Sequence, residues 1–196
     1  VDVGIITCNL HDVEDSYITE PCIPQCLYVS LNHATRFFRE FYNIVQHRTV
    51  LYWYLRSNAH GSGAGVDGGL ILTQAALERL TYYLGHRGKS AAERVRKALT
   101  VMQINTGIRR NCQKLRALAR KNGWQDGPYA LTEIRNDLIH PKQKYGNTLS
   151  GSYYEGWNLG QWYVELMLMH LFSHNGRYGN RITQTWEGEV VSVPWA

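Results

Sequence analysis

A short segment with helical spacing carries the residues best suited to chemistry. Residues 131–141 read L-T-E-I-R-N-D-L-I-H-P. On a helical wheel Leu131, Ile134 and Leu138 form one apolar stripe. Arg135 falls within this stripe, where a guanidinium is costly unless it is paired or faces a wet cleft that binds an anion. Arg135 is therefore a candidate anion-binding residue.

His140 closes the same segment and directly precedes Pro141. The pyrrolidine ring disfavours helical geometry at the preceding residue, so the helix should end or kink at His140 and leave the imidazole at its terminus. Asn136 lies four residues earlier and shares a face with His140. The long side chain of Arg135 can converge on the same target, which makes Arg135, Asn136 and His140 the catalytic candidates. A buried Arg–Glu pair beside a surface histidine explains the pattern equally well.

The stretch R-N-D-L-I-H-P resembles the signature of the HEPN superfamily, an arginine followed a few residues later by histidine, often with a polar residue after the arginine. The segment L-T-Q-A-A-L-E-R-L and the tail from G-R-Y-G-N-R-I to V-P-W are also similar to C-terminal HEPN domains of bacterial anti-phage defence proteins. This resemblance covers about residues 30–195 and implies an all-α bundle of four or more helices. Lys142 stands where some toxin members carry a tyrosine, so regulation through that tyrosine is not implied.

The resemblance implies an endoribonuclease that needs no metal or other cofactor. The ribose 2′-hydroxyl would attack the adjacent phosphate and leave 2′,3′-cyclic phosphate and 5′-hydroxyl ends. His140 would transfer a proton, because histidine titrates near neutral pH. Arg135 would bind the phosphate and stabilise its growing charge, and Asn136 would hold His140 or the phosphate in place.

The resemblance also implies a homodimer, because two copies of the motif in one cleft supply both a proton acceptor and a proton donor. The apolar run 162–172 would help to bury the contact between the subunits. We expect a cytoplasmic effector domain of a larger anti-phage defence or toxin protein. One alternative is a non-catalytic RNA-binding or dimerisation module with a phosphate-binding Arg/His site. Another is a structural domain whose basic segment contacts a protein.

Positive charge is concentrated in one part of the chain. The formal net charge is +5, and eleven of the 21 Lys and Arg residues lie within residues 87–121, where Glu93 is the only acid. Such a concentration is typical of a polyanion partner, although most charge runs are only solvated helix faces. We predict RNA contacts at five basic residues: Arg109, Arg110, Lys114, Lys142 and Lys144.

The N-terminal part contains four possible zinc ligands in a C-x2-H and C-x3-C arrangement: Cys8, His11, Cys22 and Cys26. Their types suit zinc, but the tight paired knuckles of most zinc sites are missing, so ordinary packing is the favoured interpretation. Cys112 is expected in the core. His170 and His174, one turn apart, could contact a metal but are expected in core or surface roles. Three aromatic side chains could stack on bases or pack in the core: Tyr153, Tyr154 and Trp157.

Helical periodicity dominates the chain after residue 30. It predicts helices over about 31–58 and 70–84, and a third that begins at a Ser90–Glu93 capping box and keeps its apolar spacing to a stop at Asn122-Gly123. A fourth carries Pro128 in its first turn. The last, 154–174, is apolar nearly all round and is expected at the centre of the bundle or shared with a partner chain.

The expected organisation has three parts: an N-terminal extension over 1–29, a helical bundle over 30–175 and a tail over 176–196 packed on the bundle. Within the tail, residues 181–193 alternate weakly and predict a short hairpin. The longest apolar-rich run is far below the roughly 20 residues that cross a bilayer, so no membrane partner is expected. The chain begins at Val1, and we interpret it as a C-terminal part of a longer protein.

Overall fold

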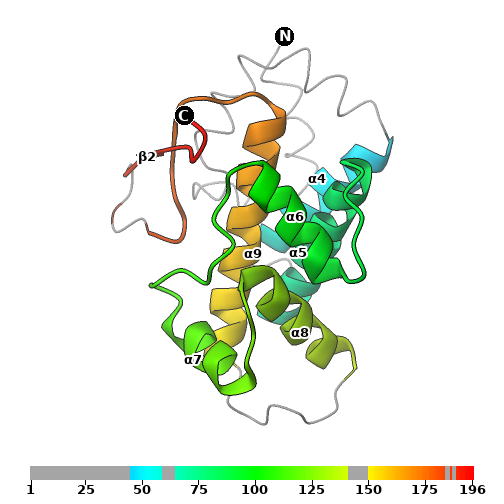
Figure 1. The fold of residues 1–196 in the computed structure, drawn as a ribbon, viewed down its shortest axis with the longest axis vertical. Coiled ribbons are helices and arrows are strands. Elements are labelled where there is room, and N and C mark those ends of the chain that lie inside the picture. Colours follow the sequence, from blue (N-terminus) through cyan, green and yellow to red (C-terminus); the bar gives the residue numbers. More distant parts are fainter. Residues whose placement is uncertain (1–44, 59–64, 141–149, 184–185, 187–188) are drawn as a thin grey trace.

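The computed structural model describes residues 45–58, 65–140, 150–183, 186 and 189–196 (Figure 1). In these ranges the chain is all-α, as predicted, with six helices and one small antiparallel sheet. The helices are α4 Val45–Asn58, α5 Gly65–Tyr83, α6 Ala91–Val101, α7 Gln113–Asn122, α8 Gly127–Ile139 and α9 Ser150–Leu171. The strands are β1 Arg177–Tyr178 and β2 Val191–Ser192. None of the helices in this part of the chain combines the length and apolar character that a bilayer crossing requires.

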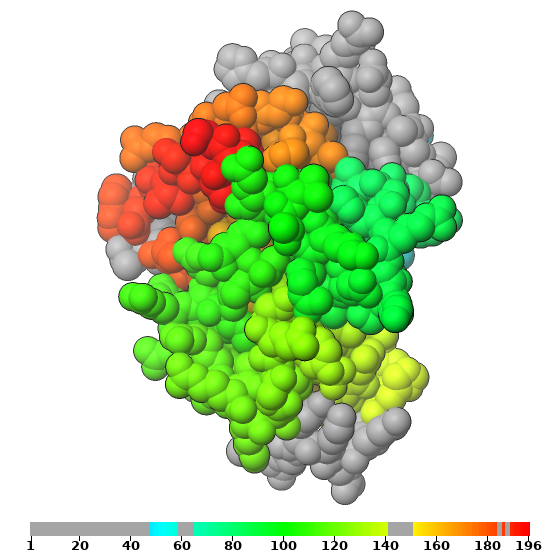
Figure 2. Space-filling view, in the orientation of Figure 1, coloured from blue at the N-terminus to red at the C-terminus, as the bar shows by residue number. Residues whose placement is uncertain are grey.

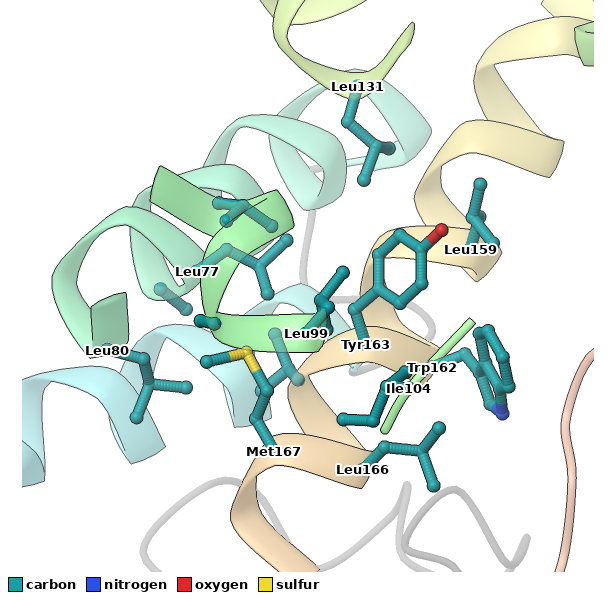
Figure 3. Close-up of a cluster of buried hydrophobic side chains, with 14 of the residues drawn as sticks. Leu77, Leu80, Leu99, Ile104, Leu131, Leu159, Trp162, Tyr163, Leu166 and Met167 are labelled. Atoms are coloured by element: carbon teal, nitrogen blue, oxygen red, sulfur yellow. The ribbon is translucent and has the colours of Figure 1, made fainter. Parts of the chain in front are cut away.

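Helix α9 is the centre of the bundle. It packs against α4, α5, α7 and α8, and residues 161–169 are all buried (Figure 1). Figure 3 shows Leu159, Tyr163 and Leu166 of this helix among side chains from α5, α6 and α8. The central position predicted from its all-round apolar character is confirmed. The suggestion that this helix buries a contact between subunits is wrong, because its apolar side chains are already covered within one chain.

The predicted third helix is interrupted. Helix α6 ends at Val101, and Gln103 adopts a left-handed conformation with φ 59°. The amide of Ile104 then donates to the Leu99 carbonyl at 2.8 Å, which closes the helix end. A loop leads to α7. The sequence pattern seemed continuous because Ile104 and Cys112 are buried in the same core although they lie outside both helices.

Local capping signals fix the start of α6 and the end of α7. The Ser90 hydroxyl accepts from the Glu93 amide at 3.2 Å, as predicted, whereas the Glu93 carboxylate accepts from the Lys89 amide at 2.7 Å instead of completing the box with Ser90. Lys89 and Lys97 both lower the pKa of Glu93, the Lys97 hydrogen bond being the main cause. Gly123 ends α7 in the left-handed region with φ 67°. The boundaries near the site are therefore set mainly by local chemistry.

The C-terminal tail folds back over α9. Strands β1 and β2 pair antiparallel, with Tyr178 opposite Val191. A hairpin-like tail is thus confirmed, but its first strand precedes the predicted 181–193 segment. The Trp162 indole donates to the Tyr178 hydroxyl at 3.0 Å, so the first strand is anchored on α9.

Candidate functional site

Helix α8 carries Arg135 and Asn136, and His140 follows directly at its C-terminal end. Its start is held by Asp126, whose side chain accepts from the Tyr129 amide at 2.9 Å, and Pro128 follows in the first turn. Arg96 donates to both Asp126 carboxylate oxygens, and this hydrogen bonding raises the pKa of the Arg96 guanidinium. The α6 side chain thereby fixes where α8 begins. Sequence reasoning missed Asp126, although an Asp two residues before a Pro is an N-cap signal.

Helix α8 ends where Pro141 predicts. Ile139 is the last helical residue, and His140 is the C-cap with φ −125° and ψ 70°. The His140 amide donates to the Asn136 carbonyl at 2.8 Å, and the residue is exposed. Its imidazole makes no hydrogen bond with any described residue. The imidazole therefore lies at a helix terminus, open to solvent or to a ligand.

Arg135 is half-buried and bonded to its neighbour. Its Nη1 donates to the Asn136 Oδ1 at 3.1 Å, so Asn136 orients the guanidinium and does not hold the His140 ring. Within the described ranges, Arg135 makes no ion pair with a carboxylate. The described residues therefore do not form the buried Arg–Glu pair of the alternative interpretation. The charge of the Arg135 guanidinium remains available to bind an anion.

Arg135 lines a cleft of about 1000 Å³ between α4, α5, α6 and α8. Figure 2 shows the face on which the segment around α6, in green, meets the end of α8, in yellow-green. Twelve residues line the cleft: Trp53, Ala75, Glu78, Arg79, Tyr82, Tyr83, Gly85, His86, Arg87, Gly88, Arg94 and Arg135. Four of these are arginines and one is a carboxylate, so the cleft is strongly positive.

The arginines of the cleft differ in how they are held. Arg94 pairs loosely with Glu78, with Nη2 and Oε2 3.7 Å apart and both side chains partly exposed. The guanidinium carbon of Arg79 lies 5.5 Å from the centroid of the Trp53 ring and 5.6 Å from that of Tyr83. Arg79 has no carboxylate partner in the part of the chain that the structure describes, and its buried Nε has no hydrogen-bond acceptor. Its charge is stabilised by aromatic faces rather than neutralised.

A histidine missed by sequence reasoning also lines the cleft. Gly85, with φ 72°, ends α5, and the His86 amide donates to the Thr81 carbonyl at 3.0 Å. This is the six-residue helix-ending bond that a left-handed glycine makes possible. The L-G-H sequence after the helix was the available signal. It positions the half-buried His86 beside Arg87.

The predicted RNA-binding residues are not gathered at this cleft. Arg109 lies over the Trp162 ring, with its guanidinium carbon 5.2 Å from the centroid. Arg110 and Lys114 are exposed, and none of these three residues lines the cleft. Helix α7, which begins at Gln113 and carries Lys114, packs on α9, whereas α6 packs on α8. Lys142 and Lys144 lie outside the described residues.

The possible metal and stacking residues have other surroundings. His174 is buried, with Nε2 3.2 Å from the Arg177 carbonyl oxygen. His170 meets the Trp195 ring edge to face at 4.9 Å between centroids. No cluster of His, Cys, Asp or Glu in the described ranges could hold a metal. The predicted zinc ligands lie outside these ranges: Cys8, His11, Cys22 and Cys26.

The aromatic residues at the start of α9 divide between core and surface. Trp157 is 6% exposed and belongs to the core, and Cys112 is likewise buried. Tyr153 is half-buried and donates to Asp137 Oδ2 at 3.2 Å. Tyr154 is 50% exposed and stands edge to face against Trp157. Of the three stacking candidates, Tyr154 presents the most surface.

Fold and site together define an all-helical domain in which Arg135 lines an arginine-rich cleft, whereas the exposed His140 is not among the residues that line it. The chain belongs to the family of YopA C-terminal domains, whose profile matches residues 43–192. It is similar to the SPbeta prophage-derived uncharacterized protein YopA of Bacillus subtilis (strain 168), with 31% identity over 161 residues, which cover 74% of this chain and 34% of that protein. The chain thus spans about a third of the length of the curated relative it matches. No solved structure matches it.

Proposed function

We propose that this domain is a metal-independent endoribonuclease of the HEPN type, the effector domain of an anti-phage defence or toxin protein. The observation that carries the proposal is Arg135, a half-buried guanidinium without a carboxylate partner among the described residues, which faces a cleft with three further arginines. A cleft with this charge favours a phosphate ligand. The prophage origin in the relative's name fits a role in conflict between phages and bacteria.

In this proposal the reacting phosphate binds at Arg135, oriented by Asn136. The guanidinium stabilises the charge that builds on the non-bridging oxygens as the 2′-hydroxyl attacks. His140 accepts the hydroxyl proton or protonates the leaving 5′-oxygen. The 2′-oxygen forms the new bond to phosphorus while the bond to the 5′-oxygen breaks, which leaves a 2′,3′-cyclic phosphate and a 5′-hydroxyl.

The test is cleavage of labelled RNA in EDTA, with identification of both ends. Arg135→Gln should lower the rate about 100- to 1000-fold, as for loss of a group that stabilises the transition state. His140→Ala should lower it about 100- to 10,000-fold. Arg120→Gln removes an exposed arginine of α7 and is the matched control. Strict dependence on magnesium, or efficient cleavage of DNA, would exclude this mechanism.

The proposed assembly is a homodimer whose two motifs share one active site. The exposed position of His140, whose ring has no described partner, supports this arrangement, since a second subunit can bring its own histidine to the other side of the phosphate. Mixed dimers of wild type with His140→Ala should retain much less than half of the activity per site. A monomer with full activity at nanomolar concentration would rule out the shared site.

The alternative is a module that binds RNA without cutting it. The same exposed imidazole favours it, because no described group positions that ring for proton transfer. Intact RNA that remains bound by Arg135, and is released by Arg135→Gln, would establish binding in place of cleavage.

The basic residues around α7 can be tested independently of catalysis. Changing Arg109, Arg110 and Lys114 together to Gln should weaken RNA binding. The slope of log affinity against log salt should become shallower by about two, because each contact with single-stranded RNA releases about 0.7 counterions. Unchanged affinity at low salt would show that this surface faces another partner.

A further inference from the structure

The cleft at Arg135 is larger and more aromatic than a phosphate alone requires. Its volume of about 1000 Å³ lies at the upper end for small-molecule sites, roughly 300–1000 Å³. Three of its lining residues are aromatic: Trp53, Tyr82 and Tyr83. This lining suits a ligand that has a planar part in addition to an anionic one.

The aromatic residues and one arginine form a continuous wall. The Arg79 guanidinium carbon lies 5.5 Å from the centroid of the Trp53 ring and 5.6 Å from that of the Tyr83 ring, and Arg79 has no carboxylate partner in the described part of the chain. Tyr82 stands edge to face against Tyr83, with 6.0 Å between centroids, and is 74% exposed. The wall therefore presents the Arg79 guanidinium and the solvent-exposed Tyr82 ring, which packs against Tyr83.

We propose that this wall, Trp53, Arg79, Tyr82 and Tyr83, is a nucleobase subsite that holds the base next to the phosphate bound by Arg135. Unpaired bases stack on aromatic rings and on guanidinium planes. An acidic peptide would satisfy the arginines but would leave the stacking surfaces unused. The inference rests on the proposed function in one respect, namely that Arg135 binds the phosphate of a nucleotide.

The test compares ligands with and without a base by calorimetry. Adenosine 5′-monophosphate should bind the wild-type protein about tenfold more tightly than ribose 5-phosphate, since one stacked base contributes about a factor of this size. Tyr82→Ala should remove most of this difference, and Arg79→Gln should reduce it. Arg135→Gln should weaken both ligands alike.

Matched controls lie outside the cleft. Trp186→Ala removes an exposed aromatic side chain, and Arg120→Gln an exposed arginine, and neither residue lines the cleft, so neither change should alter the affinity for adenosine 5′-monophosphate. Tyr82 is mostly exposed, and its replacement should leave the helical circular dichroism intact. If Arg79→Gln unfolds the protein, Tyr82→Ala alone still decides the test.

The outcomes separate this subsite from the proposed function. Equal affinity for the two ligands, or a preference that Tyr82→Ala leaves unchanged, overturns the subsite whether or not RNA is cut. A base preference that Tyr82→Ala removes supports it even if RNA stays intact, in which case the endonuclease proposal fails alone. Competition with an uncleavable oligonucleotide of 2′-deoxyuridines identifies the source of the nucleotide. If Tyr82→Ala weakens the affinity for the mononucleotide but not for the oligonucleotide, the assignment of the subsite to a polynucleotide strand is wrong.

Discussion

Arg181 joins the C-terminal tail to the core through a buried carboxylate. Glu165, on α9, is fully buried and accepts from the Tyr54 hydroxyl at 2.9 Å and from Arg181 Nε at 2.8 Å. Arg181 Nη2 also donates to Glu165 Oε1 and to Asn58 Oδ1, the latter at 2.9 Å. The pair links α4, α9 and the tail. Replacing Arg181 by Gln therefore tests what holds these three segments together.

The expected cost follows from the burial of the two partners. Removing one partner of a buried ion pair typically destabilises a protein by about 3–5 kcal/mol, because the other charge is left uncompensated. The Arg181 side chain keeps 19% exposure, whereas that of Glu165 has none, so we expect a value near the lower limit, about 3 kcal/mol. At roughly 2–4 °C per kcal/mol for a chain of this size, Tm should fall by about 6–12 °C.

Urea and thermal unfolding followed by circular dichroism measure this loss. Arg177→Gln is the matched control. The side chain of this exposed arginine of the same tail donates, among the described residues, only to the Val190 carbonyl at 3.1 Å, so its loss should cost less than about 1 kcal/mol. Adding Glu165→Gln to Arg181→Gln should recover part of the loss, because the unpaired charge disappears. A change in Tm below about 2 °C for Arg181→Gln, or strictly additive effects, would refute the reasoning.

Three further measurements address burial. Desolvation lowers the pKa of His170, so the unfolded chain binds the proton more readily than the folded protein. The free energy of unfolding should therefore fall as the pH drops below about 6.5 and level off below the folded-state pKa. His170→Gln should flatten this fall in urea titrations. Burial raises the pKa of the Cys112 thiol to about 11, so little of it is the reactive thiolate at pH 8. Iodoacetamide at pH 8 should therefore leave Cys112 unmodified in the folded protein, as measured by peptide mass analysis. Labelling as fast as in urea would contradict this expectation. A methyl group at Gly127 would overlap the Tyr163 hydroxyl and lie 3.1 Å from the Thr106 carbonyl oxygen. Gly127→Ala should therefore lower the free energy of unfolding in urea by about 1–3 kcal/mol. Unchanged stability would show that the neighbouring groups move aside without cost.

Local signals in the sequence determined most of the helix ends near the site. Ser90 begins α6, Gly123 ends α7, and Pro141 stops α8 at His140. Each signal acts within a few residues, through a hydrogen bond to a free backbone amide or through the backbone angles that a residue can adopt. The central position of α9 was likewise predictable, because a helix that is apolar all round must be covered.

Only the tertiary structure decided where the apolar and charged side chains lie relative to one another. Ile104 is buried from a loop as completely as it would be from a helix, so spacing alone could not reveal the break after α6. The basic residues 87–121 likewise lie on different parts of the bundle, which spacing in the sequence does not reveal. Arg94 reaches the Arg135 cleft because α6 packs on α8, whereas Lys114 lies on α7, which packs on α9. Arg79 lines the same cleft from α5, although it precedes Arg135 by more than fifty residues in the chain. Such neighbours are chosen by the packing of whole helices, which no local pattern of residues specifies.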